Sequence, residues 1–180
     1  TFFNGADIDT TQSQFGGASL RIGGSPEQVA VTDSDAFFFG TSDFTIDFWT
    51  RFNTLGTNQG FFDQSTGVGD YQTMGVIGAN LQYQVESNNV SQILIQRAWT
   101  PGTATWYHSV GWHDATNNVV GVSINLSATT AAYTSGITTG SASFLLGSVN
   151  DGTHSFMDGR IDEAGFWSKV LTAQHRSDLY

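Results

Sequence analysis

Apolar and polar residues alternate along several short stretches of the chain, most clearly in FTIDFWTRF at residues 44–52. Successive side chains of a β-strand point to opposite faces, so this pattern predicts a strand with two different surfaces. One face is apolar and is expected in the core: Phe44, Ile46, Phe48 and Phe52. The other face carries one aromatic between an acid and a base, which suits a half-exposed surface: Thr45, Asp47, Trp49 and Arg51.

Similar strand-like segments recur along the whole chain, separated by turns rich in Gly, Asn, Asp, Ser and Thr. The predicted strands are 18–22, 28–31, 44–52, 60–64, 71–77, 81–86, 92–96, 105–112, 119–125, 143–148 and 159–167. Many short strands at close spacing predict an all-β antiparallel sandwich. Only the tail favours a helix, with Thr172 as its N-cap and residues 173–179 after it. No repeat or linker interrupts the pattern, so one domain over residues 1–180 is expected.

Composition narrows the possible partners. The chain has 180 residues, of which 39% are hydrophobic, and this is enough for one sizeable core. A net charge of -10 repels phosphate backbones and anionic lipid, so no nucleic-acid or membrane-surface binding is expected. No apolar run approaches the roughly 18 residues of a membrane span. The absence of Cys excludes disulfides, a thiol nucleophile and Cys-ligated zinc.

The segment DGRIDEAGFW at residues 158–167 combines strand alternation with adjacent carboxylates. Asp162 shares a face with Phe166, and Glu163 shares the opposite face with Trp167. Whichever face packs inward, one carboxylate enters the core region. Such a carboxylate needs a hydrogen-bonding partner or a metal ion, because burying it unpaired costs several kcal/mol.

Four stretches together resemble the laminin-G-like members of the concanavalin A-like lectin/glucanase superfamily. They are FGGASLRIGG, FTIDFWTRF, TWYHSVGWH followed by VVGVSIN, and DGRIDEAGFWSKVLTAQHRSDLY at the end. The resemblance implies a jelly roll of two antiparallel sheets, mostly non-catalytic, that binds glycans or proteins and often holds Ca²⁺. The chain departs from the family pattern at Gly23 and Gly24, where an Asp is common.

The resemblance implies a structural calcium site around Asp162, completed by backbone carbonyls near Gly23 and Gly24. A hard cation with oxygen ligands would satisfy the buried carboxylate. The alternative is that Asp162 pairs with Arg160, with Arg21 or with backbone N–H groups.

Sugar recognition needs aromatic faces for stacking and amides or carboxylates for the hydroxyls. The candidates in predicted loops are Trp99, Tyr71 and Tyr133, with Asn89, Asn118 and Asp151 as polar partners. The candidates on strands are Trp49 with Asp47 and Arg51, and Trp112 with His108. Core packing is the alternative for every one of the aromatics, because a domain with 24 of them needs most inside.

An enzyme is not expected. Glycoside hydrolysis uses two carboxylates across the scissile bond, and the chain has only three Glu and no Glu-x-Asp-x-x-Glu spacing. Asp43 and Asp47 are four residues apart, but Asp43 stands at the strand start. A G-x-S-x-G elbow is also missing. His108 and His113 would face opposite sides of one strand, which argues against a zinc pair.

The sequence therefore predicts a non-catalytic, lectin-like module that binds carbohydrate on an extracellular or particle surface. A structural, decoration or adhesion module of a virus, a phage or a long exported protein is the alternative, with a protein partner. An accessory domain beside a catalytic domain is a third possibility.

Overall fold

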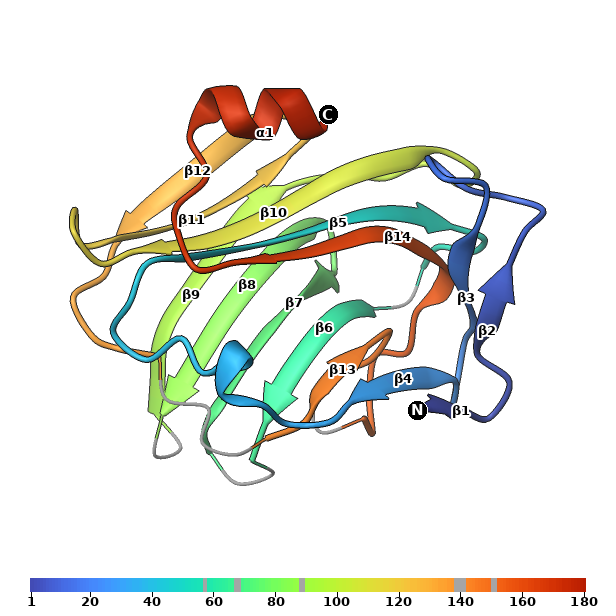
Figure 1. Cartoon of the computed structure of the whole chain (residues 1–180), viewed down its shortest axis with the longest axis horizontal. Helices are drawn as coiled ribbons and strands as arrows, with labels where there is room; N and C mark the ends of the chain where they lie inside the picture. The colour runs from blue at the N-terminus through green and yellow to red at the C-terminus, as the bar shows by residue number, and fades with distance from the viewer. Residues whose placement is uncertain (57, 67–68, 88–89, 138–141, 150–151) are drawn as a thin grey trace.

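A computed structural model describes residues 1–56, 58–66, 69–87, 90–137, 142–149 and 152–180. Two antiparallel sheets of seven strands pack face to face, which confirms the predicted all-β sandwich (Figure 1). The first sheet has the order β1-β4-β13-β6-β7-β8-β9. Its strands are β1 (Phe2–Phe3), β4 (Gln28–Val31), β13 (Phe144–Leu146), β6 (Gln59–Ser65), β7 (Tyr71–Ile77), β8 (Asn80–Ser87) and β9 (Val90–Ala98).

The second sheet has the order β12-β11-β10-β5-β14-β3-β2. Its strands are β12 (Ser127–Ala132), β11 (Val119–Ile124), β10 (Trp106–Asp114), β5 (Phe44–Phe52), β14 (Asp158–Trp167), β3 (Ser19–Gly23) and β2 (Asp7–Asp9). The first and last thirds of the chain meet here, since β14 lies between β5 and β3. This pairing places the C-terminal DGRIDEAGFW segment in the middle of the sheet.

The core lies between the two sheets and is built from aromatic rings. Phe44, Phe48 and Phe52 of β5 are fully buried, which confirms the predicted inward face of this strand. On the first sheet the rings of Phe62 and Phe144 stack with centroids 4.7 Å apart. Interdigitated aromatics of this kind supply most of the apolar area that folding buries.

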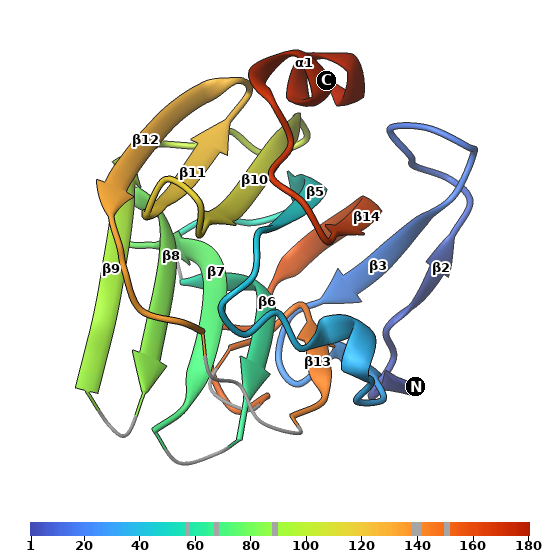
Figure 2. The ribbon, with the colours of Figure 1, turned by 60° about the vertical axis from the view of Figure 1, so that its left-hand side comes forward.

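The outer face of β5 is buried as well, so the expectation of a half-exposed surface was wrong. Thr45, Asp47 and Trp49 are at most 4% exposed, and only Arg51 is half-buried. The chain that follows β14 crosses this face, where Thr45 donates to the carbonyl of Lys169 at 2.9 Å. Figures 1 and 2 both place the C-terminal helix outside the second sheet. Periodicity within one strand cannot reveal a cover supplied by another segment.

The C-terminal helix α1 (Ala173–Leu179) confirms the predicted helical tail. Thr172 is its N-cap and accepts a hydrogen bond from the backbone N–H of His175 at 3.1 Å. Arg176 lies over the ring of Trp112, 4.5 Å from its centroid, and so fastens the helix to the sheet. No helix among the described residues is long and apolar enough to cross a membrane.

Sequence patterns missed the shortest and most polar elements. The structure adds β1, β2 and β12 at the sheet edges, and a 3₁₀ helix at Asp35–Phe37. Two or three residues carry too little alternation to be recognised, and SATTAA in β12 has no large apolar side chain. These strands form because a neighbouring strand offers them backbone hydrogen bonds.

Candidate functional site

The four glycan-binding candidates that the structure describes do not all lie in one place. Trp99 follows β9 at one end of the sandwich, whereas Tyr71 begins β7 and lies near the other end. Asn118 is exposed in the turn between β10 and β11, with φ +56°. Asn89 and Asp151 lie outside the described residues. Trp99 and Tyr71 therefore belong to different ends of the sandwich, while the N–H of Tyr133 donates to the carbonyl of Asn118 at 2.8 Å.

Tyr133 lies in the loop after β12, as expected, but its side chain belongs to the core, which was the alternative considered for it. Its side chain is 5% exposed and its ring makes an edge contact with His113. The hydroxyl donates to the carbonyl of Gly136 at 2.9 Å. Burial raises the pKa of this phenol. A ring so enclosed cannot offer a face to a sugar.

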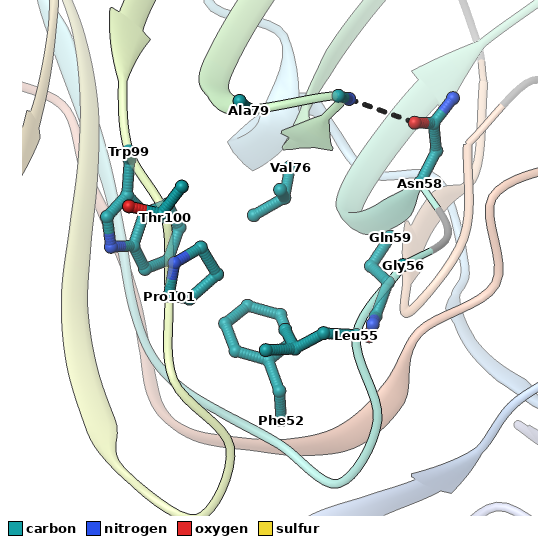
Figure 3. A pocket seen from close by; sticks show the side chains of 11 residues that line it. Phe52, Leu55, Gly56, Asn58, Gln59, Val76, Ala79, Trp99, Thr100 and Pro101 are labelled. Atoms are coloured by element: carbon teal, nitrogen blue, oxygen red, sulfur yellow. Dashed lines mark hydrogen bonds between the residues drawn. The ribbon is translucent and has the colours of Figure 1, made fainter.

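Trp99 does line a pocket, of about 390 Å³, between the two sheets at one end of the sandwich. Phe52 of β5 forms its floor, and Trp99 and Pro101 form one wall (Figure 3). The remaining lining comes from the segment after β5, the first residue of β6, the end of β7 and the turn between β7 and β8: Leu55, Gly56, Asn58, Gln59, Val76, Gly78 and Ala79. We call this the Trp99 pocket.

The indole of Trp99 is held in a fixed orientation. Its backbone N–H donates to the carbonyl of Ala79 at 2.9 Å. Its ring packs edge-on against Tyr107 at 5.1 Å and contacts Phe52 at 5.8 Å. The hydroxyl of Tyr107 in turn accepts the N–H of Gly102 at 2.7 Å, which fixes the loop after Trp99. A rigid aromatic loses little conformational entropy when a ligand packs against it.

Polar groups in the pocket are few and uncharged. Asn58 accepts the backbone N–H of Gly78 at 3.0 Å, and this bond orients its amide at the rim (Figure 3). Gln59 is 1% exposed, and both ends of its amide are already used, by Thr54 and by the N–H of Asp158. Thr100 adds an exposed hydroxyl. None of the described residues that line the pocket is acidic or basic.

A second hollow of about 530 Å³ lies beside α1, between Phe15, Trp167 and Glu163. Its buried acid, Asp47, is already paired: it accepts the indole N–H of Trp167 at 2.6 Å and lies 3.2 Å from Nε2 of His108. These contacts hold β5, β10 and β14 together, so we assign the Asp47 carboxylate a structural role in the second sheet.

The strand-based aromatics are covered. Trp49 is 4% exposed and donates its indole N–H to the carbonyl of Leu179, while its ring stacks on Tyr180 at 5.6 Å. Trp112 is 5% exposed beneath Arg176. The C-terminal helix and Tyr180 thus cover both Trp49 and Trp112, so neither ring is available to a sugar.

Asp162 is 7% exposed, as expected of the carboxylate that enters the sheet. Its Oδ2 accepts the backbone N–H groups of Gln14 and Phe15 at 2.7 and 3.1 Å, and its Oδ1 accepts that of Glu163 at 3.0 Å. Of the alternatives considered for this acid, the backbone N–H groups are its partners. Three such donors stabilise a buried carboxylate without a cation.

The predicted calcium ligands do not fit an ion. Gly23 is paired with Asp158, four residues and about 13 Å along β14 from Asp162. The N–H of Gly24 donates to the carbonyl of Met157, beyond that pair. Both oxygens of Asp162 already accept hydrogen bonds, and no group of three His, Asp or Glu side chains is arranged to hold a metal among the described residues.

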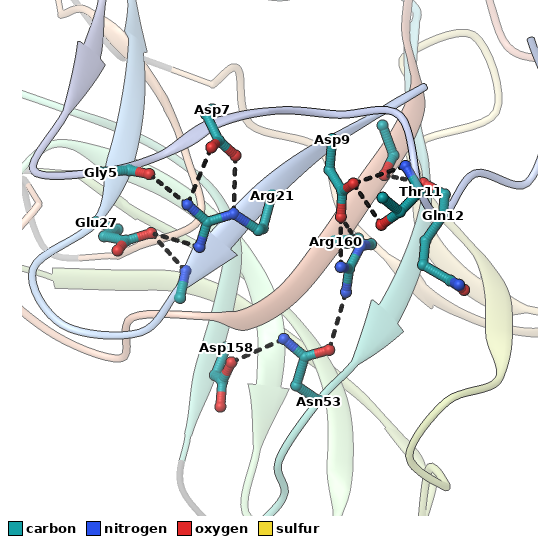
Figure 4. Close-up of polar contacts among 12 residues, drawn as sticks. Gly5, Asp7, Asp9, Thr11, Gln12, Arg21, Glu27, Asn53, Asp158 and Arg160 are labelled. Atoms are coloured by element: carbon teal, nitrogen blue, oxygen red, sulfur yellow. Dashed lines mark hydrogen bonds and ion pairs between the residues drawn. The ribbon is translucent and has the colours of Figure 1, made fainter. Parts of the chain in front are cut away.

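Arg160 and Arg21 have other partners than Asp162 (Figure 4). Arg21 donates to Asp7 at 2.8 Å and to the carbonyl of Gly5. Arg160 donates to Asp9 at 2.9 Å and to the side chain of Asn53. These pairs hold the edge strand β2 against β3 and β14.

The sequence identified Trp99 but missed the rest of its pocket. Phe52 reads as core from its strand pattern, and it is indeed fully buried while one edge still lines the pocket. Leu55, Val76 and Ala79 come from separate turns and strand ends. The only local indication was an isolated Trp followed by Pro101 and Gly102 in an otherwise polar loop.

Comparison with solved structures shows the same fold at low sequence identity. Domain 4 of AbnA, an extracellular arabinanase from Geobacillus stearothermophilus, aligns with TM-score 0.78 and 19% identity over 98% of this chain and 81% of that one. The botulinum neurotoxin serotype G binding domain aligns with TM-score 0.74 and 13% identity over 98% of this chain and 46% of that one. The NanB sialidase from Streptococcus pneumoniae aligns with TM-score 0.70 and 16% identity over 88% and 27%. The chain thus spans less than half the length of the last two proteins.

Curated protein sequences give no match. The sequence model described as the concanavalin A-like lectin/glucanases superfamily, in its laminin-G-like branch, matches residues 23–175. This range covers the second and third stretches on which the resemblance rests, the fourth up to residue 175, and only Gly23 and Gly24 of the first. The chain belongs to the concanavalin A-like lectin/glucanases superfamily.

Proposed function

We propose that this chain is a non-catalytic carbohydrate-binding module that holds a neutral sugar ring against Trp99. The observation that carries the proposal is a half-buried, fixed indole on the wall of an apolar pocket with amide and hydroxyl groups at its rim. The C–H face of a sugar is apolar and packs on an aromatic ring, while its hydroxyls need hydrogen-bonding groups. Trp99, Asn58 and Thr100 offer this combination.

The charge of the pocket favours an uncharged sugar. No Lys or Arg is present among its described lining residues, and the whole chain has a net charge of -10. An anionic saccharide would therefore meet repulsion without a compensating cation. AbnA domain 4 was solved in complex with arabinotriose, a neutral oligosaccharide, and this supports arabino-oligosaccharides as the first ligands to test.

The same residues argue against catalysis in the pocket. Hydrolysis of a glycosidic bond by the usual route needs an acid and a second carboxylate within about 10 Å of each other. The described lining residues supply neither. We infer a role in adhesion or in targeting, either as a lectin-like module on an extracellular or particle surface or as an accessory domain beside an enzyme.

Replacement of Trp99 by Leu tests the proposal, because Leu keeps apolar volume in the pocket but removes the aromatic face. Calorimetric titration with arabinotriose and with a panel of neutral oligosaccharides should show at least a tenfold loss of affinity, about 1.4 kcal/mol. Trp106→Ala is the matched control, since Trp106 is also half-buried but lies at the start of β10 outside the pocket. Equal binding by Trp99→Leu and the wild type would contradict the proposal.

A second candidate is a structural or adhesion module with a protein partner. Phe2 and Phe3 of the edge strand β1 are 51% and 39% exposed, and Val31 on the adjacent β4 is 37% exposed. An apolar sheet edge of this kind can pair with another chain. Light scattering would detect self-association, and Phe2→Ser with Phe3→Ser should abolish it if this edge is the contact.

A further inference from the structure

The hollow beside α1, on the outer face of the second sheet, is large enough for a ligand. Its volume of about 530 Å³ lies within the range of small-molecule pockets, roughly 300–1,000 Å³. Aromatic side chains from three segments line it: Phe15 from the loop between β2 and β3, Trp49 from β5 and Trp167 from β14. The ring of Phe15 stands edge-on to that of Trp49, with centroids 5.7 Å apart, and Phe15 is 46% exposed. We call this cavity the α1 pocket.

A β-bulge in β14 shapes the α1 pocket. The pairing of β14 with β5 shifts register between Asp162 and Gly165, so the two residues between them, Glu163 and Ala164, bulge out of the ladder. Glu163 has φ +46°, which is uncommon for a residue other than Gly, and it lines the pocket together with Ala164 and Gly165. A Cβ at Gly165 would collide with Oδ1 of Asp47, so glycine is required where β14 passes this acid. Bulges re-aim side chains, and this one brings a carboxylate of a central strand to the pocket.

The side-chain hydrogen-bond donors of the α1 pocket are already used. Among its described lining residues only the two tryptophans carry a side-chain donor. Trp49 donates its indole N–H to the carbonyl of Leu179 at 3.3 Å, and Trp167 donates its indole N–H to Asp47 at 2.6 Å. A ligand therefore meets two aromatic rings whose polar edges are occupied.

Hydrogen-bond acceptors, in contrast, are available in the α1 pocket. Glu163 and Asp178 line it with exposed side chains. No described residue donates a hydrogen bond to the Glu163 carboxylate, and one oxygen of Asp178 accepts the amide of Gln174 at 2.8 Å. Lys, Arg and His are absent from the described lining of this pocket. The free polar capacity is thus entirely that of negatively charged acceptors.

We propose that the α1 pocket binds an alkyl ammonium or guanidinium group, carried by a free amine or by a Lys or Arg side chain of a partner. Both groups have several donor hydrogens and no acceptor, so they match Glu163 and Asp178. Charge-assisted hydrogen bonds to carboxylates are stronger than neutral ones, and aromatic faces attract cations. A sugar hydroxyl also needs a donor, which the side chains of this pocket do not offer. The net charge of -10 further concentrates cations at the surface.

The α1 pocket is separate from the Trp99 pocket in place and in chemistry. No described residue lines both of them, and the Trp99 pocket lies between the sheets at one end of the sandwich. The described lining of the Trp99 pocket has no charged side chain, whereas the α1 pocket has exposed carboxylates. The inference therefore goes beyond the proposed function and does not depend on it.

Two double variants with equal net charge test the carboxylates. Glu163→Gln with Asp178→Asn neutralises the α1 pocket, while Asp33→Asn with Asp35→Asn neutralises two exposed acids elsewhere. Ligand-observed NMR titration measures the binding of butylammonium, of butylguanidinium and of butanol as their neutral analogue. The wild type should bind either cation about tenfold more tightly than butanol, and the pocket variant should lose most of that difference. The control variant should stay within about twofold of the wild type, because distant surface charges are screened.

A second pair of variants tests the aromatic wall. Phe15→Leu keeps apolar volume but removes an aromatic face, and it should weaken cation binding about threefold. Phe38→Leu is the matched control, since Phe38 is 56% exposed and lies outside the described lining of the α1 pocket. All the substituted side chains in both tests are exposed, so each variant should fold as the wild type does, which thermal unfolding verifies.

Several outcomes would overturn the inference. They are no binding of either cation by the wild type, equal binding of butanol, and equal losses in the two double variants, which would show that net charge alone attracts the cations. If the pocket variant alone loses binding, the source of the cation is identified by comparing cadaverine with blocked tripeptides that have a central lysine or arginine. Tighter binding of the tripeptides supports a partner's side chain as the ligand, and tighter binding of cadaverine supports a free amine.

Discussion

The carboxylate of Asp162 on β14 accepts the backbone N–H of Gln14 at 2.7 Å, across 148 residues of sequence. The same oxygen accepts the N–H of Phe15, and the other oxygen accepts that of Glu163. One side chain therefore ties the loop between β2 and β3 to the centre of the second sheet. The N–H groups of that loop are in turn the hydrogen-bonding partners that this buried carboxylate requires.

Replacing Asp162 by Ala should lower the free energy of unfolding by about 3 kcal/mol. Three backbone donors would lose a charged acceptor, and buried donors left unsatisfied cost about 1–3 kcal/mol each, reduced where water enters. Urea denaturation measures the change. Asp33→Ala, in the exposed loop after β4, is the control and should shift stability by no more than about 0.5 kcal/mol. A shift at Asp162 as small as the control would show that these hydrogen bonds add little.

Calcium should leave the melting temperature unchanged. Asp162 has both oxygens occupied by N–H donors, and Gly23 and Gly24 are held about 13 Å or more from it. Thermal unfolding in excess calcium and in excess chelator measures this directly. A ligand that binds only the folded state raises the melting temperature, so a rise with calcium would reveal a site elsewhere in the chain.

Because of Asp9, the free energy of unfolding should decrease as the pH falls into the acid range. The hydroxyl and N–H of Thr11, together with the Arg160 guanidinium, hold the pKa of Asp9 well below its usual range (Figure 4). An acid with a lowered pKa stabilises the fold above its unfolded pKa of about 3.9, and this contribution is lost as the pH falls further. Asp9→Asn should therefore unfold more easily than the wild type at neutral pH, with the difference shrinking below about pH 4.

Asp7→Asn is the matched control for Asp9. Asp7 also pairs with an arginine of the same sheet, but its side chain is 54% exposed. Exposed ion pairs contribute little because water and salt screen them. We expect a much smaller difference in urea midpoint at every pH, and an equal effect of the two variants would contradict the role assigned to Asp9.

Tyr71 should titrate at about pH 12, later than an ordinary tyrosine. Burial is the larger cause and Glu86 the second. Glu86→Gln should therefore lower the pKa of Tyr71 only part of the way to 10, because the burial remains. The ultraviolet absorbance of phenolate, taken as the difference between the wild type and Tyr71→Phe, isolates this residue from the other tyrosines. Because the pKa is raised, protonated Tyr71 contributes stability to the fold below about pH 10, and this contribution is lost as the pH rises toward 12.

Much of the architecture could be predicted from local pattern. FTIDFWTRF gave its inward face correctly, and Thr172 marked the start of α1. Both depend on interactions between residues a few positions apart, which a sequence displays directly. The edge strands β1, β2 and β12 could not be predicted, because their neighbours in the sheet, not their own residues, make them strands.

Most of the candidate site, by contrast, could not be predicted from local pattern. Trp99 could be selected from its loop, but the pocket beside it needs Phe52 from one sheet and Val76 from the other. Gln82 and Gln96 meet only because β8 and β9 pair in one register, and a shift of β8 by one residue would turn Gln82 inward. The choice between a loop site and core packing for Tyr133 could not be made from the sequence, because nothing in TTAAYTSG shows that the segment folds over the core.

The sequence by itself determined where the longer strands of the two sheets lie, which face of FTIDFWTRF enters the core, and that one carboxylate of DGRIDEAGFW must find a partner inside. Only the tertiary structure decided that this partner is the backbone near Gln14, that α1 covers Trp49, and that Trp99 borders a pocket. Alternation and capping act over a few residues, so they are visible in the chain. Partners and covers come from segments that are distant in sequence and meet only when the two sheets pack.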